Sequence, residues 1–599
     1  MDKMKKFIKK KKSEILTVIF LFLMFILAIT SLRNETITND EVVHLPAGYS
    51  YITKFDYRMN PEHPPLLKAF AALPLLFTKI NFPQTEAWQN VDQWTWGYQF
   101  LFQSGNNADL LIFLGKIPPI LILMLLGWYL FLWAKTLYNE KIAVFVVGLY
   151  SFCPIFLAHG RFVTTDVAIT TFTFITLYYF WLFLKSKESS FKNNKLFWKF
   201  AVAFALTFLV KFSAPAVIIM LLGVALLYIL SFETKKEKIG ALRKTFLAIF
   251  WGGVFSIAAI TVVYFIFTFK LPPEIARNFI DREIQYGFLI IPKRFFVPFL
   301  KWAVGIPILK GLAWYFVGMA MVFAHAAGGH TTYFLGEIGN GWRYYFPVIF
   351  NLKSTLPTLI VFYTIFAYLL GKFYRYLKDL IWMKANLAKF IKENFDIFYL
   401  FLPIAIYFIL GATTNLNLGV RYLLPIYPFI YLLSGYAVYL LANLLKEKIK
   451  LAYLDFLIMT GLLLWQFLSA ISVYPYFLPF YNGLAGGADN GYKYAVDSNL
   501  DWGQDLKRLK VYMDEHNINK IYLSYFGKAS PEYYGINYEP LSPDMEGKIQ
   551  GFVAISATNL QGAYKEFNSK SVKEPAFEWL KKYPLVGKVG YSIFIYNVR

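Results

Sequence analysis

Apolar residues recur along most of the chain in runs close to the length that a helix needs to cross a bilayer. The runs fall at about residues 15–32, 110–134, 142–158, 166–185, 198–212, 214–231, 245–268, 355–371, 397–411, 422–443 and 453–474. A transmembrane helix needs about 20 predominantly apolar residues. The pattern therefore predicts a polytopic α-helical membrane protein with about eleven spans.

Two longer segments separate these runs. Residues 33–108 are rich in Trp and Pro, and they contain the amphipathic stretch "LLKAFAALPLLF" at 66–77. That stretch is too short to span comfortably, so we expect a helix lying along the membrane interface. In the second segment, 269–354, the stretch 285–330 is apolar enough for a further pair of spans or for interfacial helices.

The pattern changes at about residue 475. A polar stretch with helical periodicity follows, and then "KIYLSYFG", "FVAISATNL" and "YSIFIYNV", whose β-branched and aromatic residues are typical of short strands. We therefore predict a membrane domain over residues 1–474 and a soluble α/β domain over 475–599.

The placement of charged residues predicts how the chain is oriented in the membrane. The chain is 57% hydrophobic with a formal net charge of +23, and many Lys and Arg residues lie in short segments between the apolar runs. Such segments are typical of cytoplasmic loops. The predicted N-terminus is therefore cytoplasmic, while the segments 33–108 and 269–354 and the C-terminal domain are extracytoplasmic. Basic residues placed in this way argue against nucleic-acid binding.

The single cysteine, Cys153, excludes an intrachain disulfide and a Cys-rich metal site. There is also no phosphate-binding loop, no dinucleotide fingerprint and no hydrophilic cytoplasmic domain for a nucleotide-sugar.

Ionisable residues gather on the predicted extracytoplasmic side. The acids Asp40 and Glu41 follow the first run, and further candidates are His63, Lys68, Arg161, Asp166, Lys211, Tyr345, Lys353 and Arg421. Charged residues at membrane depth are costly and usually line functional cavities or form pairs. A carboxylate can accept the proton of a hydroxyl, and several cations can hold a phosphate. Together they suggest a site for a polyprenyl-phosphate carrier.

Each candidate also has a structural interpretation. Asp40 and Glu41 fit a solvated turn, and Arg161 with Asp166 fits an ion pair that caps the next helix. Interfacial anchoring or hydrogen bonding in loops would account for Lys68, Lys211, Arg421, Tyr345, His44, His63 and His159. The presence of so many of these residues on one predicted face of the membrane favours a functional site.

Several motifs resemble one known family. The stretch "NDEVVHLPAGYSYI", followed by "HPPLLK", is similar to the first external loop of the protein O-mannosyltransferase group. Its bacterial and archaeal branch, glycosyltransferase family 39, is related to the aminoarabinose lipid A transferases. Four more stretches of the chain resemble this branch, namely "GRFVTTDVAITTF", "VKFSAP", "GVRYLLPIYPF" and "VDSNLDWGQDL". The resemblance covers about residues 15–475 and reaches into the C-terminal domain.

The resemblance implies a GT-C fold and an inverting transfer of a mannose-like sugar from a polyprenyl-phosphate donor. It implies that Asp40 is the catalytic base and that Glu41 shapes the acceptor site. Contacts with the donor phosphate are implied for Lys68, Arg161, Arg421 and Lys211, and places in the substrate pocket for Asp166, His63 and Tyr345. With these cations no metal cofactor is required.

The sequence also departs from the family. No β-trefoil insert is evident, no DxD-like metal motif occurs in the first external segment, and the C-terminal domain is a different module. The acceptor therefore stays open between a protein, a lipid and a glycan.

Two other functions remain as alternatives. A transporter or flippase of lipid-linked sugars would also need many spans and buried cations, but transporters commonly contain internal repeats, and none is evident. A scaffold whose C-terminal domain binds a partner would leave the membrane cations unexplained.

The role of "VDSNLDWGQDL" is likewise open. Asp497, Asp501 and Asp505 recur at every fourth residue, which predicts one face of a helix. That face is either capped and solvated or involved in binding.

Overall fold

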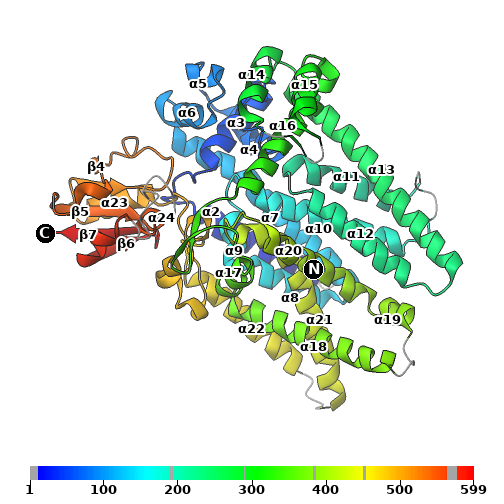
Figure 1. The fold of residues 1–599 in the computed structure, drawn as a ribbon. Helices are drawn as coiled ribbons and strands as arrows, with labels where there is room; N and C mark the ends of the chain where they lie inside the picture. Colours follow the sequence, from blue (N-terminus) through cyan, green and yellow to red (C-terminus); the bar gives the residue numbers. More distant parts are fainter. Residues whose placement is uncertain are drawn as a thin grey trace, which may run out of the picture.

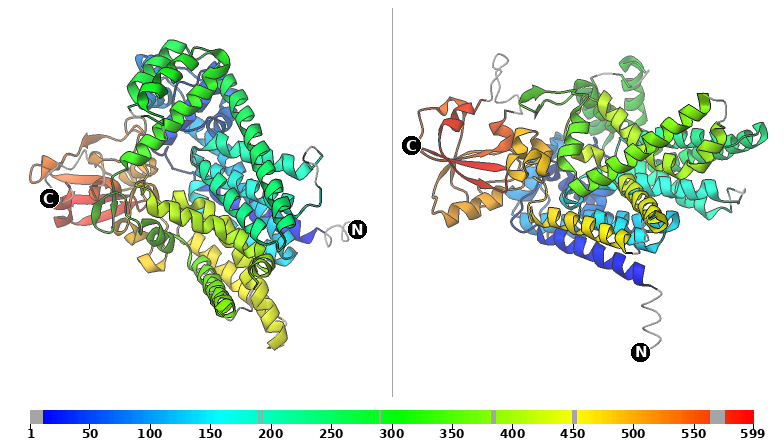
Figure 2. Two further views of the ribbon diagram at one scale, coloured as in Figure 1. Left: turned by 45° about the vertical axis from the view of Figure 1, so that its right-hand side comes forward. Right: turned by 90° about the horizontal axis from the view of Figure 1, so that it is seen from below.

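The structure is a computed structural model that describes residues 11–188, 191, 193–285, 287–288, 291–381, 386–448, 453–562 and 576–599. Long helices lie side by side, and the C-terminal sheet projects beyond one end of the helical bundle (Figures 1 and 2). The basic residues 1–10 and the end of the basic segment "KEKIK", at 449–450, lie outside the described residues.

The apolar runs form the helices of the bundle. These are α2 (Lys12–Thr30), α7 (Ala108–Leu137), α8 (Glu140–Ser151), α9 (Pro154–His159), α10 (Thr165–Lys185), α11 (Lys195–Val210), α12 (Pro215–Leu230), α13 (Lys235–Phe267), α18 (Leu356–Ile381), α20 (Phe395–Thr413), α21 (Tyr427–Lys448) and α22 (Leu454–Ile471). The prediction of a polytopic helical protein is confirmed.

Shorter elements connect them. The first connecting segment forms α3 (Glu41–Lys54), α4 (Leu66–Ala72) with a following 3-10 turn (Leu73–Phe77), α5 (Glu86–Gln89) and α6 (Gln93–Tyr98). The later ones form α14 (Pro273–Glu283), α15 (Lys293–Ala303), α16 (Pro307–Gly328), β1 (Thr332–Phe334), β2 (Glu337–Gly339), α17 (Tyr345–Lys353) and α19 (Leu387–Glu393).

Within the described residues, nine helices are long and apolar enough to cross a membrane. Eight of them coincide with predicted runs, and the ninth is α16. The remaining three runs form shorter helices: 142–158 divides into α8 and α9, and α11 and α12 have 16 residues each. Pro154 accounts for the division, because proline cannot continue a helix from the preceding turn.

Helix α16 joins the ends of two other helices. Near its start, Lys310 Nζ donates to the carbonyl oxygens of Phe269 and Leu271, just beyond α13, at 3.3 and 3.0 Å. After its end, the amide of His330 donates to Asn415 O, just beyond α20, at 3.4 Å. Helix α16 therefore bridges the end of α13 and the end of α20.

The C-terminal region holds a five-stranded sheet of order β4-β3-β5-β7-β6. Its strands are β3 (Ile521–Ser524), β4 (Tyr538–Pro540), β5 (Gly551–Ser556), β6 (Leu585–Val589) and β7 (Ile593–Val598), with α23 (Leu506–Glu515) and α24 (Ala557–Leu560). Strand β3 is parallel to β4 and β5, whereas β7 is antiparallel to β5 and β6. All three strands predicted in the sequence are present.

One local prediction is wrong. Residues 497–505 do not form a helix, and Asp497, Asp501 and Asp505 are buried rather than solvated. Asp497 has a φ of +57° in a short 3-10 turn, and Gly503 has a φ of +85°. Left-handed backbone at these two positions prevents a continuous helix, so α23 begins only at Leu506.

Candidate active site

A cavity of about 1070 Å³ lies where several helix ends converge. Its lining includes charged residues, namely Asp40 before α3, Asp166 in the first turn of α10, Lys211 after α11 and Arg421 after α20. It also includes apolar side chains of α12, α16 and α20, among them Ile219, Phe323 and Leu410. Such a cavity suits a molecule with a charged group attached to an apolar chain.

Four of the predicted residues form one chain of ion pairs in this cavity. Arg421 Nη1 lies 3.1 Å from Asp40 Oδ2 and 3.7 Å from Asp166 Oδ2, and Lys211 Nζ lies 2.5 Å from Asp166 Oδ1. The Asp40 side chain is 25% exposed, but that of Asp166 only 2%. Asp166 also lies at the N-terminus of α10, where the helix dipole stabilises a negative charge. Asp40 is therefore the more accessible carboxylate.

Aromatic rings hold the two cations. The Arg421 guanidinium carbon lies 4.3 Å from the ring centre of Trp502, and Lys211 Nζ lies 4.8 Å from that of Tyr422. Trp502 belongs to the motif "VDSNLDWGQDL" and lines the cavity together with Asp497. For Asp497 the sequence left a binding role open, but Trp502 was not identified, because its distance from Arg421 along the chain conceals this contact.

Glu41 has a different environment from its neighbour Asp40. Its carboxylate accepts hydrogen bonds from the amides of Thr38 and Val163, at 2.9 and 2.7 Å, and lies 3.3 Å from Lys116 Nζ. The residue is buried and is absent from the lining of the cavity. Glu41 thus joins the segment before α3 to the loop before α10.

Lys68 is also enclosed. Its Nζ donates to Asn60 O, Asn60 Oδ1 and His63 O, at 2.7, 2.9 and 2.7 Å, so all three of its protons are used. The residue does not line the cavity, whereas Asn60 and His63 do. The ammonium group of Lys68 therefore supports the cavity wall in this structure and does not face a bound phosphate.

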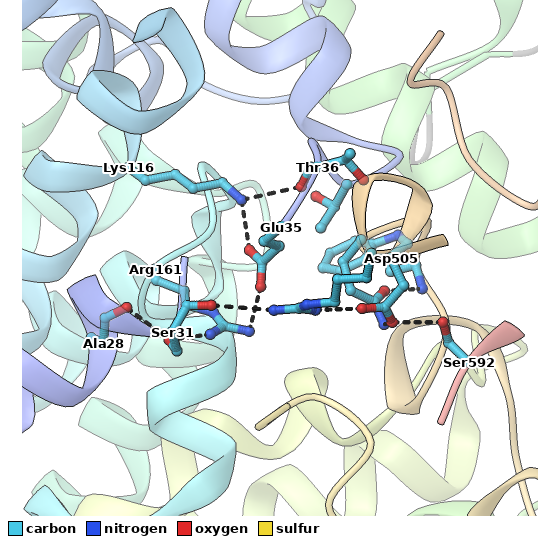
Figure 3. Close-up of polar contacts among 12 residues, drawn as sticks. Ala28, Ser31, Glu35, Thr36, Lys116, Arg161, Asp505 and Ser592 are labelled. Carbon is cyan, nitrogen blue, oxygen red and sulfur yellow. Dashed lines mark hydrogen bonds and ion pairs between the residues drawn. The ribbon is translucent and has the colours of Figure 1, made fainter. Parts of the chain in front are cut away.

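Arg161 lies in a buried network beside the cavity (Figure 3). Its Nη2 is 2.7 Å from Glu35 Oε2, and Glu35 Oε1 is 2.8 Å from Lys116 Nζ. Arg161 also donates to Ser31 Oγ, and Arg508 pairs with Asp505 close by. The predicted pairing of Arg161 with Asp166 is wrong, because Glu35 holds Arg161 and Lys211 holds Asp166.

The sequence interpretation missed Glu35 and Lys116. A signal for Lys116 was available in the sequence, because it lies inside the apolar run 110–134. A lysine within a membrane span needs a partner, which here is an acidic residue.

Tyr345 does not reach the cavity lining either. It is buried at the start of α17, and its hydroxyl accepts a hydrogen bond from Asn499 Nδ2 at 3.0 Å. Its predicted place in a substrate pocket therefore differs from its position in the structure.

Two histidines of the cavity wall lie edge to face, with ring centres 5.1 Å apart. Burial lowers the pKa of His44 to about 4, and burial together with the nearby His44 and Lys68 lowers the pKa of His63 well below its usual range. Both rings are neutral at pH 7. Lys211 and Arg421 supply positive charge at the cavity, and these two histidines do not. The described part of the chain contains no cluster of three His, Cys, Asp or Glu residues that could hold a metal ion.

Comparison with protein families bears on this arrangement. Residues 111–265 match the family model described as dolichyl-phosphate-mannose-protein mannosyltransferase. The match confirms the predicted resemblance over that segment. It contains Arg161, Asp166 and Lys211 of the candidate site and its supporting network. No curated protein matches the chain.

Several solved structures are similar to the chain. ArnT from Cupriavidus metallidurans in the apo state has 11% identity, 97% coverage of both chains and a TM-score of 0.42. The archaeal oligosaccharyltransferase AglB from Archaeoglobus fulgidus has 13% identity, coverage of 92% and 71%, and a TM-score of 0.43. The protein O-mannosyltransferase Pmt1–Pmt2 complex from S. cerevisiae has 15% identity, coverage of 43% and 33%, and a TM-score of 0.31.

Proposed function

We propose that this protein is an integral-membrane glycosyltransferase that moves a mannose-like sugar from a polyprenyl-phosphate carrier to an acceptor hydroxyl. The observation that carries the proposal is the contact between Asp40 and Arg421 in a cavity that is also lined by apolar side chains. The match to the mannosyltransferase family model over residues 111–265 supports the same activity and the GT-C classification.

In the proposed reaction Asp40 takes the proton of the acceptor hydroxyl. The acceptor oxygen attacks the anomeric carbon with inversion, and the bond between that carbon and the phosphate oxygen breaks. The polyprenyl phosphate leaves with the bonding electron pair. Arg421 and Lys211 stabilise the negative charge that develops on it, so the step requires no metal ion.

Arg421 is placed to serve both the base and the donor. Its Nη1 lies 3.1 Å from Asp40 Oδ2 and 3.7 Å from Asp166 Oδ2. In this proposal Arg421 keeps that position and offers its other N–H groups to the phosphate of the donor. The phosphate is thereby held next to Asp40.

The other predicted residues take supporting roles in this proposal. Lys68 fixes the loop with Asn60 and His63, while Arg161 and Glu41 fix the segments next to Asp166 and Asp40. None of these three lines the cavity, whereas Arg421 and Lys211 do, so we assign the direct phosphate contacts to Arg421 and Lys211.

A second cavity of about 400 Å³ offers a route for the acceptor. It shares Asn60, Glu62, Trp94 and Met321 with the main cavity and continues toward α14. We assign the apolar residues that line the main cavity to contacts with the polyprenyl chain, and this second cavity to a protein, lipid or glycan acceptor. In the predicted topology both open on the extracytoplasmic side.

The test is the release of undecaprenyl phosphate from undecaprenyl-phosphate mannose by the purified protein. Replacement Asp40→Asn should lower turnover about 100-fold or more, because it removes the general base. The folded state should persist, because Arg421 keeps Asp166 as a partner. A matched control is Asp281→Asn, whose exposed carboxylate pairs with Lys301 at the surface.

Near-normal turnover by Asp40→Asn would reject the assignment of the base. In reconstituted vesicles, movement of the lipid across the bilayer without sugar transfer would instead identify the alternative, a transporter or flippase.

A further inference from the structure

The segment Asp497–Asp505 of the C-terminal domain contacts the residues just before Asp40. The amide of Asn39 donates to Trp502 O at 3.0 Å, and the amide of Thr36 donates to Gln504 O at 2.9 Å. Thr36 Oγ1 also donates to Gly503 O at 2.8 Å. The backbone that leads to Asp40 is therefore fixed by main-chain atoms of the C-terminal domain.

The same segment contacts the loop that carries Arg421. Ser498 Oγ donates to Leu418 O, and the amide of Val420 donates to Asn499 Oδ1 at 3.0 Å. Between them Gly419 has a φ of +122°, and a Cβ atom there would lie 2.9 Å from Ser498 Oγ. The close fit to the segment therefore requires glycine at this position.

Trp502 completes this connection through its side chain. The Arg421 guanidinium carbon lies over its ring, 4.3 Å from the ring centre, and Arg421 Nη1 lies 3.1 Å from Asp40 Oδ2. A guanidinium group held against an aromatic ring can still offer N–H groups to an anion. The contact thus limits where the guanidinium group can lie relative to Asp40.

The segment is itself held rigidly. Lys353 Nζ donates to Asn499 O at 2.5 Å, the amide of Thr558 donates to Asp501 Oδ2 at 2.9 Å, and Gln504 Oε1 accepts from the amide of Trp502 at 2.8 Å. Trp502 is only 1% exposed. Displacement of these groups would require breaking several buried hydrogen bonds at once.

We propose that the segment Asp497–Asp505 is a positioning element of the active site, in which Trp502 sets the Arg421 guanidinium at its working distance from Asp40 and the donor phosphate. This inference rests on the proposed glycosyl transfer. It makes the C-terminal domain part of the catalytic centre, and it gives "VDSNLDWGQDL" a role in that chemistry. Small errors in the placement of a reacting or charge-stabilising group are costly to the rate.

The experiment compares Trp502→Phe with Trp502→Leu in the full chain. Both replacements remove part of the indole, but only phenylalanine keeps an aromatic face for Arg421. We expect Trp502→Leu to lower kcat for undecaprenyl-phosphate mannose about tenfold and Trp502→Phe to retain most of it. The control is Trp579→Phe in the core of the same domain, which should leave kcat unchanged.

A purely structural role for Trp502 would affect the two variants equally, and equal losses overturn the inference. A double-mutant cycle gives a second criterion. If Trp502 acts through Arg421, adding Trp502→Leu to Arg421→Lys should cause no further loss of kcat. Losses that multiply in the double variant would show that the two residues act independently.

A binding measurement separates this inference from the proposed function. Should the wild-type protein transfer no sugar, its affinity for undecaprenyl phosphate alone still reports on Arg421. Weaker binding by Trp502→Leu, about tenfold, with normal binding by Trp502→Phe supports positioning of the cation. Equal affinity of both variants and the wild type contradicts it.

Discussion

Asp501 provides a test of the electrostatics in the C-terminal domain. The residue is 1% exposed, its Oδ2 accepts the amide of Thr558, and its Oδ1 has no hydrogen-bond partner among the described residues. Burial, opposed in part by the Thr558 hydrogen bonds, raises the pKa of Asp501 from 3.8 to about 7. The folded protein therefore holds a proton here that the unfolded chain releases above about pH 4.

The size and sign of the effect follow from this difference. Between about pH 4 and pH 7 the folded state binds more protons at this site than the unfolded state, so stability falls as the pH rises. The interval corresponds to about 4 kcal/mol in total, of which about 3 kcal/mol falls above pH 5. Asp501→Asn removes this titration and can keep the bond from Thr558. Its amide adds a constant cost of about 1–3 kcal/mol for an unpaired donor.

The assay is the melting temperature of both proteins in detergent between pH 5 and pH 8. We expect the variant to gain on the wild type as the pH rises from 5 to about 7, by an amount equivalent to about 3 kcal/mol, and the difference to level off above that pH. Asp544→Asn, an exposed carboxylate in the same domain, should show no comparable trend. A constant difference between Asp501→Asn and wild type across the whole range would refute the reasoning.

Two further predictions concern the buried network and the absence of a metal requirement. The replacement Glu35→Gln leaves Lys116 paired with Glu41 but removes the carboxylate partner of Arg161. It should therefore lower the free energy of unfolding by about 3–5 kcal/mol, measured by thermal unfolding. The control Asp514→Asn removes an exposed ion pair and should cost less than about 1 kcal/mol. Excess EDTA should leave sugar transfer unchanged, because Arg421 and Lys211 supply the positive charge; activity lost to EDTA and restored by Mg²⁺ or Mn²⁺ would contradict this.

The helices of the bundle were largely predictable, because the condition that a lipid bilayer imposes on a segment can be recognised from the residues of that segment alone. Every backbone polar group in lipid must be satisfied within its own segment, so a long apolar run specifies a helix. Composition does not specify how a helix is oriented relative to the membrane. The apolar composition of α16 therefore left open whether this helix crosses the membrane or follows its surface.

Pairing within the site was much less predictable. Arg161 and Asp166 are close in sequence, but their partners come from distant segments, Glu35 for one and Lys211 for the other. The repeat of Asp497, Asp501 and Asp505 suggested a helix, yet Gly503 and the left-handed Asp497 gave an irregular loop. Such outcomes depend on tertiary contacts, which periodicity along one segment does not record.

The hydrogen bond from Thr36 to Gly503 joins residues 467 positions apart. During synthesis the first of these emerges long before the second, so the surroundings of Asp40 stay incomplete until residues 497–505 have been made and have reached that segment. A chain that ends before residue 497 would lack these contacts even with its long helices in place. Under the proposed function, such a chain would therefore transfer no sugar.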